Sequence, residues 1–467
     1  MRFSVRNLGS VRRADIELKP LTIFVGPNNA GKTWLAYTLA GFLGEYGQSQ
    51  YTRFLISSNS IQETYPPLDS AIRQFLDEGS ATINLVQFAE QYADVYFKRS
   101  ASHTRHWLQD YLGTKRRAFK QLSLDINIAD MRKVFFDQIS DYSVDAGFPQ
   151  GQPLLRAVKN ADNPILYFYA EEKIAEKLPP QQIRSFLLDN VFKAFHAAIY
   201  SNVYIFPTER TTLISLISGM RLASISTTPN EPNPGVQFPP VQAPLGYFVN
   251  MIGNLLSIKP LQRLSEADDP SIGEYMSLAS LLERGILSGE IENASSALDV
   301  VLMEFLFKPA KDVSLEMQIS SSMVKELSPF VLYLRYLAKP GQLLVIDEPE
   351  MNLHPLAQVR FMELLAMLVN AGLNILFTTH STFMVDHLVN LIKAKGISEQ
   401  EDIQNKFFLG SSNAFLSKDQ VSVYLFEKRE AHNILHKDGS IDWGTFSNVS
   451  SQVQGIFLDL VEREVSE

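Results

Sequence analysis

The stretch GPNNAGKTW, residues 26–34, places two glycines, a lysine and a threonine at the spacing G-x-x-x-x-G-K-[ST]. In this pattern the loop amides surround phosphate oxygens, and the next helix adds the positive end of its dipole. Lys32 would reach the β- and γ-phosphates, and Thr33 would supply a hydroxyl to Mg²⁺. The residues predicted to contact a nucleotide here are Gly26, Pro27, Asn28, Asn29, Ala30, Gly31, Lys32, Thr33 and Trp34.

A second group of reactive side chains lies far downstream, in LLVIDEPE and ILFTTH. Asp347 ends an apolar run and is predicted to bind Mg²⁺, and Glu348 is placed to orient or deprotonate the attacking water. His380 ends the next apolar run and could contact the γ-phosphate. The alternatives are an acid pair that caps a loop and a histidine that merely packs.

Strands and helices must bring these groups together. The apolar run LTIFV leads into the glycine loop, and a helix of about four turns is expected from Lys32 onward. This context argues against an accidental glycine loop. Strands are also expected at 2–7 and 15–25, and the order strand, helix, strand around 343–381 predicts a parallel βαβ unit. Lys32, Asp347 and His380 should therefore meet at one edge of a sheet.

Composition limits the possible classes of protein. The 467 residues are 45% hydrophobic and 20% charged, and they contain no cysteine, which excludes disulfides and thiolate metal sites. The formal net charge of −9 argues against a surface that generally coats nucleic acid. The first residues resemble neither a secretory signal nor a transit peptide, and no membrane span is expected, so we predict a cytoplasmic protein.

The chain is expected to divide into four parts. Residues 1–50 would form the first half of an α/β head, and 51–200 a mainly helical insertion with a possible strand at 165–170. Residues 201–395 would form the second half of the head, and 396–467 a small α/β extension with a terminal helix near 444–463. The proline-dense stretch 226–244 is predicted to be an extended surface loop.

The motifs GPNNAGKT, SSSMVKELSP, LLVIDEPEMNLHP and FTTHS, in this order, resemble ABC-class ATPases of the RecF/SMC/OLD type. The likeness includes YIFPTERTTL at 204–213, and it is strongest to the prokaryotic AAA-family proteins of OLD-like and anti-phage defence systems. It implies a P-loop ABC-type head with a mixed sheet and flanking helices, carrying the large helical insertion. It also implies ATP and Mg²⁺ as cofactors.

This resemblance further implies a homodimer in which the signature of one copy faces the nucleotide of the other. Here Ser320, Ser321, Ser322 and Met323 occupy the place of that signature. Ser321 matches its serine, whereas Ser322 and Met323 replace its two glycines, so slow turnover is expected. By the same likeness Leu353, His354 and Pro355 belong to a loop at the dimer interface. Two roles stay open for Arg210, a buried ion pair or a contact on the nucleotide side.

Three outputs remain open for such an ATPase. The first is a switch for a separately encoded effector in a defence module, since no nuclease cluster follows the head. The second is RecF-like DNA binding through the basic, aromatic segment 96–120, whose alternative is an amphipathic helix with a solvated basic face. The third and weakest is a transporter subunit. His432 and His436 have no third ligand in view, so a zinc site is not expected.

Overall fold

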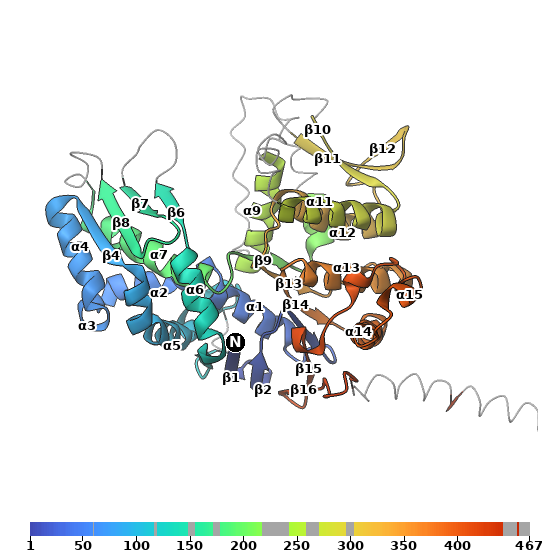
Figure 1. Cartoon of the computed structure of the whole chain (residues 1–467), viewed down its shortest axis with the longest axis horizontal. Helices are drawn as coiled ribbons and strands as arrows, with labels where there is room; N and C mark the ends of the chain where they lie inside the picture. The colour runs from blue at the N-terminus through green and yellow to red at the C-terminus, as the bar shows by residue number, and fades with distance from the viewer. Residues whose placement is uncertain are drawn as a thin grey trace, which may run out of the picture.

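The computed structural model describes residues 1–58, 60–115, 119–147, 155–170, 178–216, 242–257, 270–295, 303–441 and 455–456. Helices cover both faces of a large mixed sheet, and a smaller lobe built from the first half of the chain stands beside it (Figure 1). The expected α/β class is confirmed. Among the described residues, no helix is both long enough and apolar enough to cross a membrane.

Within the described residues, the main sheet contains nine strands. Their order is β5 (Ser123–Asn127), β1 (Arg2–Leu8), β2 (Val11–Glu17), β16 (Glu430–Asn433), β15 (Val421–Glu427), β3 (Leu21–Val25), β14 (Asn374–Thr379), β13 (Leu343–Asp347) and β9 (Val203–Phe206). From β15 to β9 every neighbouring pair is parallel. The helix α13 (Pro355–Asn370) joins β13 to β14, which confirms the predicted βαβ unit.

The register of these strands decides which residues meet at the carboxyl edge. Asp347 pairs with Thr378 across β13 and β14, and Thr379 pairs with Val25 across β14 and β3. The last residues of β3, β14 and β13 therefore lie side by side. The loops that follow these three strands emerge at the same edge of the sheet.

Alternate side chains of the central strands enter two hydrophobic cores. Phe24 of β3 joins the core that includes α1 (Lys32–Leu43), whereas Ile23 and Val25 join the core on the other face. The first core continues into α2 (Glu45–Ser58), α5 (Leu85–Tyr111) and α7 (Pro180–Ala197), and the second into α12 (Ser322–Tyr336), α13 and α14 (Thr382–Lys395). Burial on both faces explains the unbroken apolar runs of β3 and β13.

The segment 51–200 contains an antiparallel sheet in addition to the helices that we expected. Besides its helices it contains a four-stranded antiparallel sheet in the order β4 (Ser80–Asn84), β8 (Ile165–Ala170), β7 (Leu155–Lys159) and β6 (Val144–Gly147). The strand expected at 165–170 is confirmed as β8. The other elements of this lobe are α3 (Ile61–Thr64), α4 (Pro66–Glu78), η1 (Ala129–Met131) and α6 (Arg132–Asp141).

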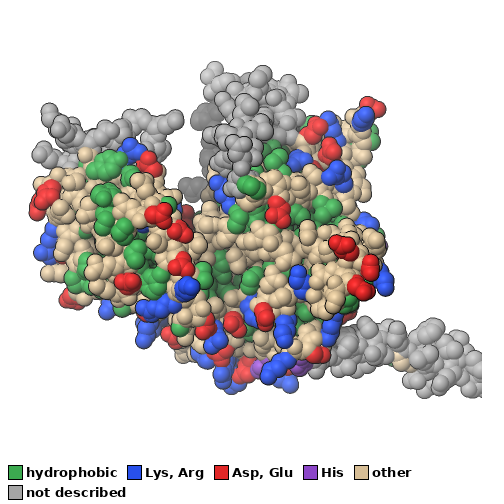
Figure 2. Space-filling model, viewed as in Figure 1, with side chains coloured by type: hydrophobic (Ala, Val, Ile, Leu, Met, Phe, Trp, Pro, Cys, Tyr) green, Lys and Arg blue, Asp and Glu red, His purple; other side chains and the backbone are tan. Residues whose placement is uncertain are grey.

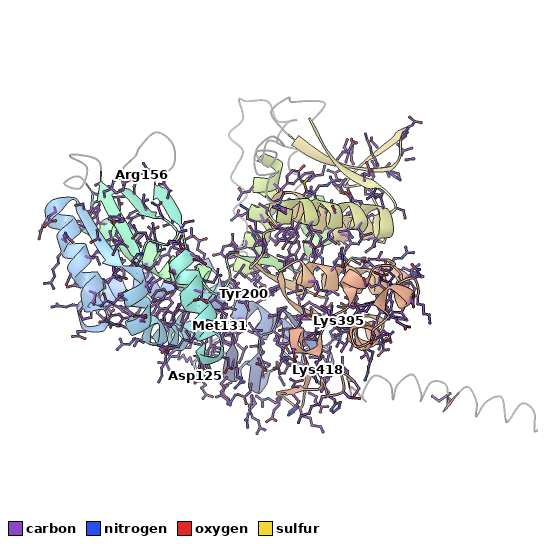
Figure 3. All side chains as sticks on the ribbon, viewed as in Figure 1. Asp125, Met131, Arg156, Tyr200, Lys395 and Lys418 are labelled. Carbon is purple, nitrogen blue, oxygen red and sulfur yellow. The ribbon has the colours of Figure 1, made fainter. Side chains whose placement is uncertain are left out.

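This lobe is joined closely to the main sheet. Its strand β5 pairs with β1 along five residue pairs. Figure 3 shows Asp125 of β5 and Met131 beside the main sheet, and Tyr200, which follows α7, where the two parts meet. The lobe therefore completes one edge of the sheet that carries the glycine loop.

The remaining described elements pack around the second core. They are α9 (Ala243–Ser257), α11 (Pro270–Leu282), the π-helical turn η2 (Glu283–Leu287), the sheet β10 (Glu290–Ser295), β11 (Met303–Ala310) and β12 (Val313–Glu316), and the short α15 (Gln400–Gln404), η3 (Ser412–Ala414) and η4 (Lys418–Gln420).

Two further expectations differ from the structure. The strand expected at 15–25 is divided into β2 and β3, since Pro20 lacks the amide that a continuous ladder needs. Residues 421–433 are not a separate extension, because β15 and β16 lie inside the main sheet between β3 and β2. The predicted proline-rich loop and terminal helix lie almost wholly outside the described residues. The four-part division of the chain stays a prediction.

Candidate active site

The loop between β3 and α1 needs glycine at two positions. Gly26 and Gly31 have φ values of 140° and 97°. A Cβ atom on Gly26 would lie 2.5 Å from the carbonyl oxygen of Phe426, and one on Gly31 would lie 2.5 Å from Cγ2 of Val11. No side chain fits there. Gly31 also begins α1 without a side-chain cap, which leaves the first helical amides available to an anion.

Lys32 turns its ammonium group back into this loop. Nζ donates to the main-chain carbonyls of Gly26 and Pro27, at 3.0 Å each, and lies 2.9 Å from Nε2 of His380. The side chain is buried, and burial lowers the pKa of Lys32. Neutral carbonyls thus hold the cation, and the oxygens of a phosphate would bind it more strongly.

Thr33 and Asp347, separated by 314 positions in the sequence, are in direct contact. The Thr33 hydroxyl donates to Oδ1 of Asp347 at 2.8 Å, and the Thr378 hydroxyl donates to the same oxygen at 2.5 Å. The other oxygen, Oδ2, has the longer contact with Tyr37, at 3.4 Å. Burial raises the pKa of Asp347. The structure therefore places a hydroxyl and a carboxylate together beside the glycine loop.

Glu348 and His380 lie next to Lys32. Glu348 has a left-handed backbone (φ 48°), which is strained for a residue with a long side chain. Its Oε1 lies 3.4 Å from Nε2 of His380, and this contact lowers the pKa of Glu348, so the carboxylate is ionised at neutral pH. A single ring nitrogen can accept from Lys32 or donate to Glu348, but it cannot do both.

Arg210 has the first of its two possible roles, the buried ion pair. Its side chain is 0% exposed and pairs with Glu326 of α12, which is also 0% exposed. Nη1 donates to the carbonyl of Asp347 at 2.7 Å, and Nη2 donates to that of Glu348 at 2.8 Å. Arg210 thus binds the main chain at the end of β13 and holds Glu348 in its strained conformation.

A pocket of about 670 Å³ lies over these groups. Its lining consists of Ser10, Asn28, Asn29, Gly31, Lys32, Thr33, Trp34, Glu348 and His380. Among the predicted residues, Gly26, Pro27 and Ala30 belong to the loop but do not line the pocket, and Asp347 is buried next to Thr33. The structure therefore brings the early loop and the late acids to one site.

Ser321 and Ser322 do not lie at this pocket. Ser321 is the N-cap of α12, with its hydroxyl accepting from the amide of Val324 at 3.3 Å, and Ser322 is the first residue of the helix. Both are exposed, and neither lines the pocket of its own chain. Of the residues expected at a dimer interface, His354 is exposed at the start of α13, whereas Leu353 is buried.

Three residues of the site were not predicted from the sequence. Glu350 accepts from the amide of His380 at 2.6 Å, and burial raises the pKa of Glu350. Thr378 bonds Asp347, and Glu326 bonds Arg210. Thr378 lies in the FTTHS motif, but its role follows from its register opposite Asp347. The motif alone does not reveal it.

The basic segment 96–120 belongs largely to α5, and its aromatic residues are core residues. Tyr96, Phe97, Trp107, Tyr111 and Phe119 are all at most 3% exposed, so they cannot stack on bases. The exposed residues of the segment include Lys98, Arg99, Arg105, Lys115 and Lys120. Arg116 and Arg117 lie outside the described residues. On the face seen in Figure 2, Lys and Arg side chains are interspersed with Asp and Glu. The interpretation as an amphipathic helix is favoured over a stacking platform.

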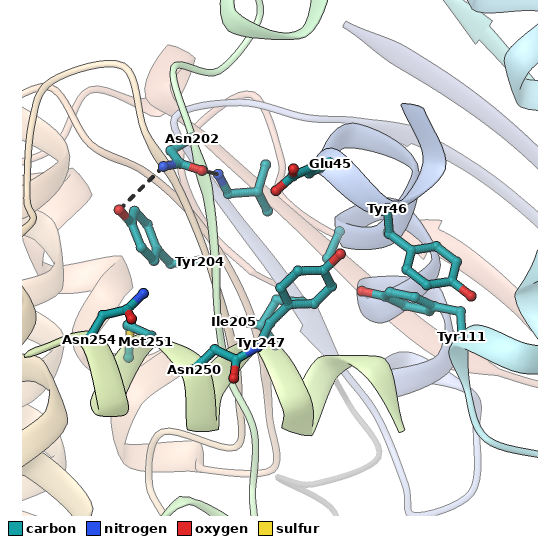
Figure 4. Close-up of a pocket in the computed structure, with 14 residues that line it drawn as sticks. Glu45, Tyr46, Tyr111, Asn202, Tyr204, Ile205, Tyr247, Asn250, Met251 and Asn254 are labelled. Atoms are coloured by element: carbon teal, nitrogen blue, oxygen red, sulfur yellow. Dashed lines mark hydrogen bonds between the residues drawn. The ribbon is translucent and has the colours of Figure 1, made fainter. Parts of the chain in front are cut away.

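A second cavity, of about 340 Å³, lies between the end of α1, β9 and α9 (Figure 4). Tyrosine and asparagine side chains dominate its wall, and Asn202 donates to the Tyr204 hydroxyl at 3.3 Å. None of the predicted site residues lines this cavity. The pocket at the glycine loop is therefore the candidate active site.

Replacing Asp347 by Asn is expected to stabilise the nucleotide-free protein. Because the pKa of Asp347 is raised by burial, ionisation opposes folding at neutral pH, and this cost disappears as the pH falls through the raised pKa toward 3.8. Asn can still accept from Thr33 and Thr378. Thermal unfolding should show a higher midpoint at pH 7, with a difference that shrinks in acid. A lower midpoint at pH 7 would contradict this account.

Comparisons with known proteins agree with the geometry. A family described as "AAA ATPase domain" matches residues 1–161, which include the glycine loop. A second family matches residues 288–386, from before Ser321 to beyond His380, and its description combines "AAA domain" with an AbiEii toxin and a Type IV TA system. The comparison with curated proteins found no match.

Several solved structures are similar to the chain at low identity. An SmcHead bound to the C-winged helix domain of ScpA has a TM-score of 0.34 and 12% identity, covering 83% of this chain and 90% of that one. An Smc head domain with an extended coiled coil, bound to the C-terminal domain of ScpA from Pyrococcus furiosus, has a TM-score of 0.36, 11% identity and coverages of 97% and 98%. For the SMC head domain from Thermotoga maritima the values are 0.29, 11%, 83% and 90%.

Proposed function

We propose that the chain is an ABC-class P-loop ATPase that hydrolyses ATP with Mg²⁺ in a site shared by two copies of itself. Closing and opening of this homodimer would switch a separate effector protein in a cytoplasmic anti-phage defence or toxin-type module. The observation that carries the proposal is the Thr33–Asp347 contact beside Lys32 in a loop that only glycine can form.

The residues present fit both ATP and Mg²⁺. Mg²⁺ commonly binds one or two carboxylates together with hydroxyl, water and phosphate oxygens, and Asp347 and Thr33 are donors of this kind. The cradle formed by Gly26 and Gly31 would be filled by any Cβ atom, as expected of a backbone that approaches phosphate closely. When bound, Mg²⁺ neutralises part of the phosphate charge and polarises the bond that breaks.

Each side chain of the pocket then has a distinct task. Lys32 would exchange its hydrogen bonds to the loop carbonyls for hydrogen bonds to phosphate oxygens. Because its pKa is lowered, Glu348 stays ionised and can orient the attacking water through its carboxylate. Glu350 holds the main chain of His380 through the amide of that residue. Once Lys32 moves, the imidazole of His380 can turn its Nε2 from Lys32 toward the γ-phosphate. Catalysis is therefore mainly positioning and charge stabilisation.

Exposed apolar side chains next to the motifs support the dimer. Ile319 is 69% exposed just before Ser321, and Phe383 is 50% exposed just after His380. Met351 and Leu356 are exposed on either side of His354. Apolar side chains exposed near a functional site are typical of an interface. A second copy would cover them and would bring its exposed Ser321 and Ser322 to the nucleotide.

The family comparison supports a separate effector and a defence setting. The toxin and TA-system wording of the family matched at 288–386 supports a toxin-type or defence module. DNA as the direct partner has weaker support, because the aromatic residues of 96–120 are buried.

Replacing Lys32 by Ala tests the proposed function. ATP affinity should fall by about a hundredfold or more, because the triphosphate loses its one ammonium partner in the loop, and hydrolysis should fall with it. Calorimetry with ATP and Mg²⁺, together with phosphate release, measures both. Lys98→Ala, an equal truncation on the exposed face of α5, is the matched control and should behave as the parent. A parent protein without ATP affinity would refute the proposal.

A further inference from the structure

Trp34 stands out among the residues that line the pocket. It is 40% exposed, although tryptophan is usually well buried, and it lines the same pocket as Lys32 and Glu348. No step of the proposed hydrolysis uses it. A large aromatic surface in a polar pocket is what a flat, apolar part of a ligand would need.

The indole is held in place on two sides. A Cβ atom on Gly9, in the turn between β1 and β2, would lie 1.6 Å from Cζ3 of Trp34, so the ring occupies the space that a side chain at Gly9 would fill. The indole also packs edge to face against the buried ring of Phe119, with centroids 5.6 Å apart and planes at 70°. The surface that Trp34 presents is therefore preorganised, which lowers the entropic cost of binding.

Trp34 also lies at the correct end of the pocket for a base. Glu348 and His380 follow β13 and β14, which lie on one side of β3. Gly9 and Ser10 form the turn that joins β1 to β2, and both of these strands lie on the other side of β3. With the phosphates in the glycine loop between them and the γ-phosphate near Glu348, the nucleoside must extend toward Ser10 and Trp34.

We infer that the indole of Trp34 is the platform on which the nucleotide base stacks, and that it makes the site selective for purine over pyrimidine nucleoside triphosphates. This inference rests on the proposed function. Stacking uses the face of a base and not its hydrogen-bonding edge, so adenine and guanine should bind alike and the smaller pyrimidines more weakly.

The test compares ligands with and without a base. For the parent, Trp34→Ala and Trp34→Phe, calorimetry would measure the affinities for AMPPNP, GMPPNP, CMPPNP and inorganic tripolyphosphate, each with Mg²⁺. Trp34→Ala should weaken AMPPNP and GMPPNP by about 10- to 100-fold and leave tripolyphosphate unchanged. Trp34→Phe should recover part of the loss. The control is Phe54→Ala, which removes a similarly exposed ring (42%) from α2.

The possible outcomes distinguish a failure of the proposed function from a failure of the inference about Trp34. If Trp34→Ala weakens tripolyphosphate as much as AMPPNP, the indole merely shapes the loop, and the inference fails while the proposed function stands. If the parent and Trp34→Ala bind all four ligands with equal affinity, the inference about Trp34 is refuted as well. If the parent binds none of the four, the proposed function and the inference fall together. Thermal unfolding of each variant checks that loss of the Phe119 contact has not unfolded the protein.

Discussion

The Glu348→Gln variant should bind ATP as tightly as the parent and hydrolyse it about 10²- to 10⁴-fold more slowly. Gln has nearly the shape of Glu but cannot carry the charge that orients or accepts a proton from water. Lys32, Thr33 and Asp347 are untouched, so the phosphate contacts remain. Single-turnover phosphate release and calorimetry measure the two effects separately. Hydrolysis at the parental rate would show that Glu348 does not act on the water.

The same variant should accumulate as an ATP-bound dimer. Light scattering after size-exclusion chromatography with ATP and Mg²⁺ would report the mass. Adding Leu356→Asp should return the variant to a monomer, because a charge would be buried against the second copy, whereas Val134→Asp, at an exposed site on α6, should not. A monomeric Glu348→Gln variant that still binds ATP would refute the shared site.

The effector can be tested with the same variant. Capture of a protein encoded by a neighbouring gene only in the ATP state would support the effector.

Loss of Arg210 should be the most damaging single change to the fold. Arg210→Ala leaves Glu326 fully buried without its counter-ion, and it removes the donors that hold the carbonyls of Asp347 and Glu348. Breaking a buried pair in this way costs about 3–5 kcal/mol, a large part of the stability of a typical domain. Urea unfolding should show a strongly lowered midpoint, or the variant should fail to fold.

A comparison of single and double variants tests whether the damage comes from the unpaired charge. Arg210→Met combined with Glu326→Met should be less destabilised than the sum of the two single changes, because no charge is left buried alone. The surface pair of Arg132 with Asp94 is the control, and Arg132→Ala should cost less than about 1 kcal/mol. If the buried and exposed pairs prove equally dispensable, Arg210 does not position the end of β13.

Sequence reasoning predicted the parts of the site that depend on local order. The glycine loop, Asp347, Glu348 and His380 each follow an apolar run that ends a strand, and parallel strands must end at one edge. Glu326, Glu350 and Thr378 could not be found in this way. Their roles depend on the register of β13 against β14 and on the packing of α12 in the second core, both of which are set by contacts distant in sequence.

Local patterns also explain why some interpretations stayed open or incomplete at the level of the sequence. The segment 96–120 alternates basic and aromatic residues, which is equally typical of a nucleic-acid platform and of a helix with one buried face. Only the contacts of α5 with the core decide between them. The residues of β15 form an apolar run that is typical of a strand, but nothing in them indicates that this strand inserts next to β3.

The position of β3 between β14 and β15 has a consequence for synthesis of the chain on the ribosome. Ser422 of β15 hydrogen-bonds Thr22 of β3 from 400 positions away, so β3 lacks that neighbour until nearly all of the protein has been translated. At about 5–20 residues per second this delay lasts about 20–80 s. For most of that time an apolar strand has both edges unpaired, because its other neighbour β14 is also translated late. The nascent chain would then depend on chaperones to prevent aggregation before it could bind any nucleotide.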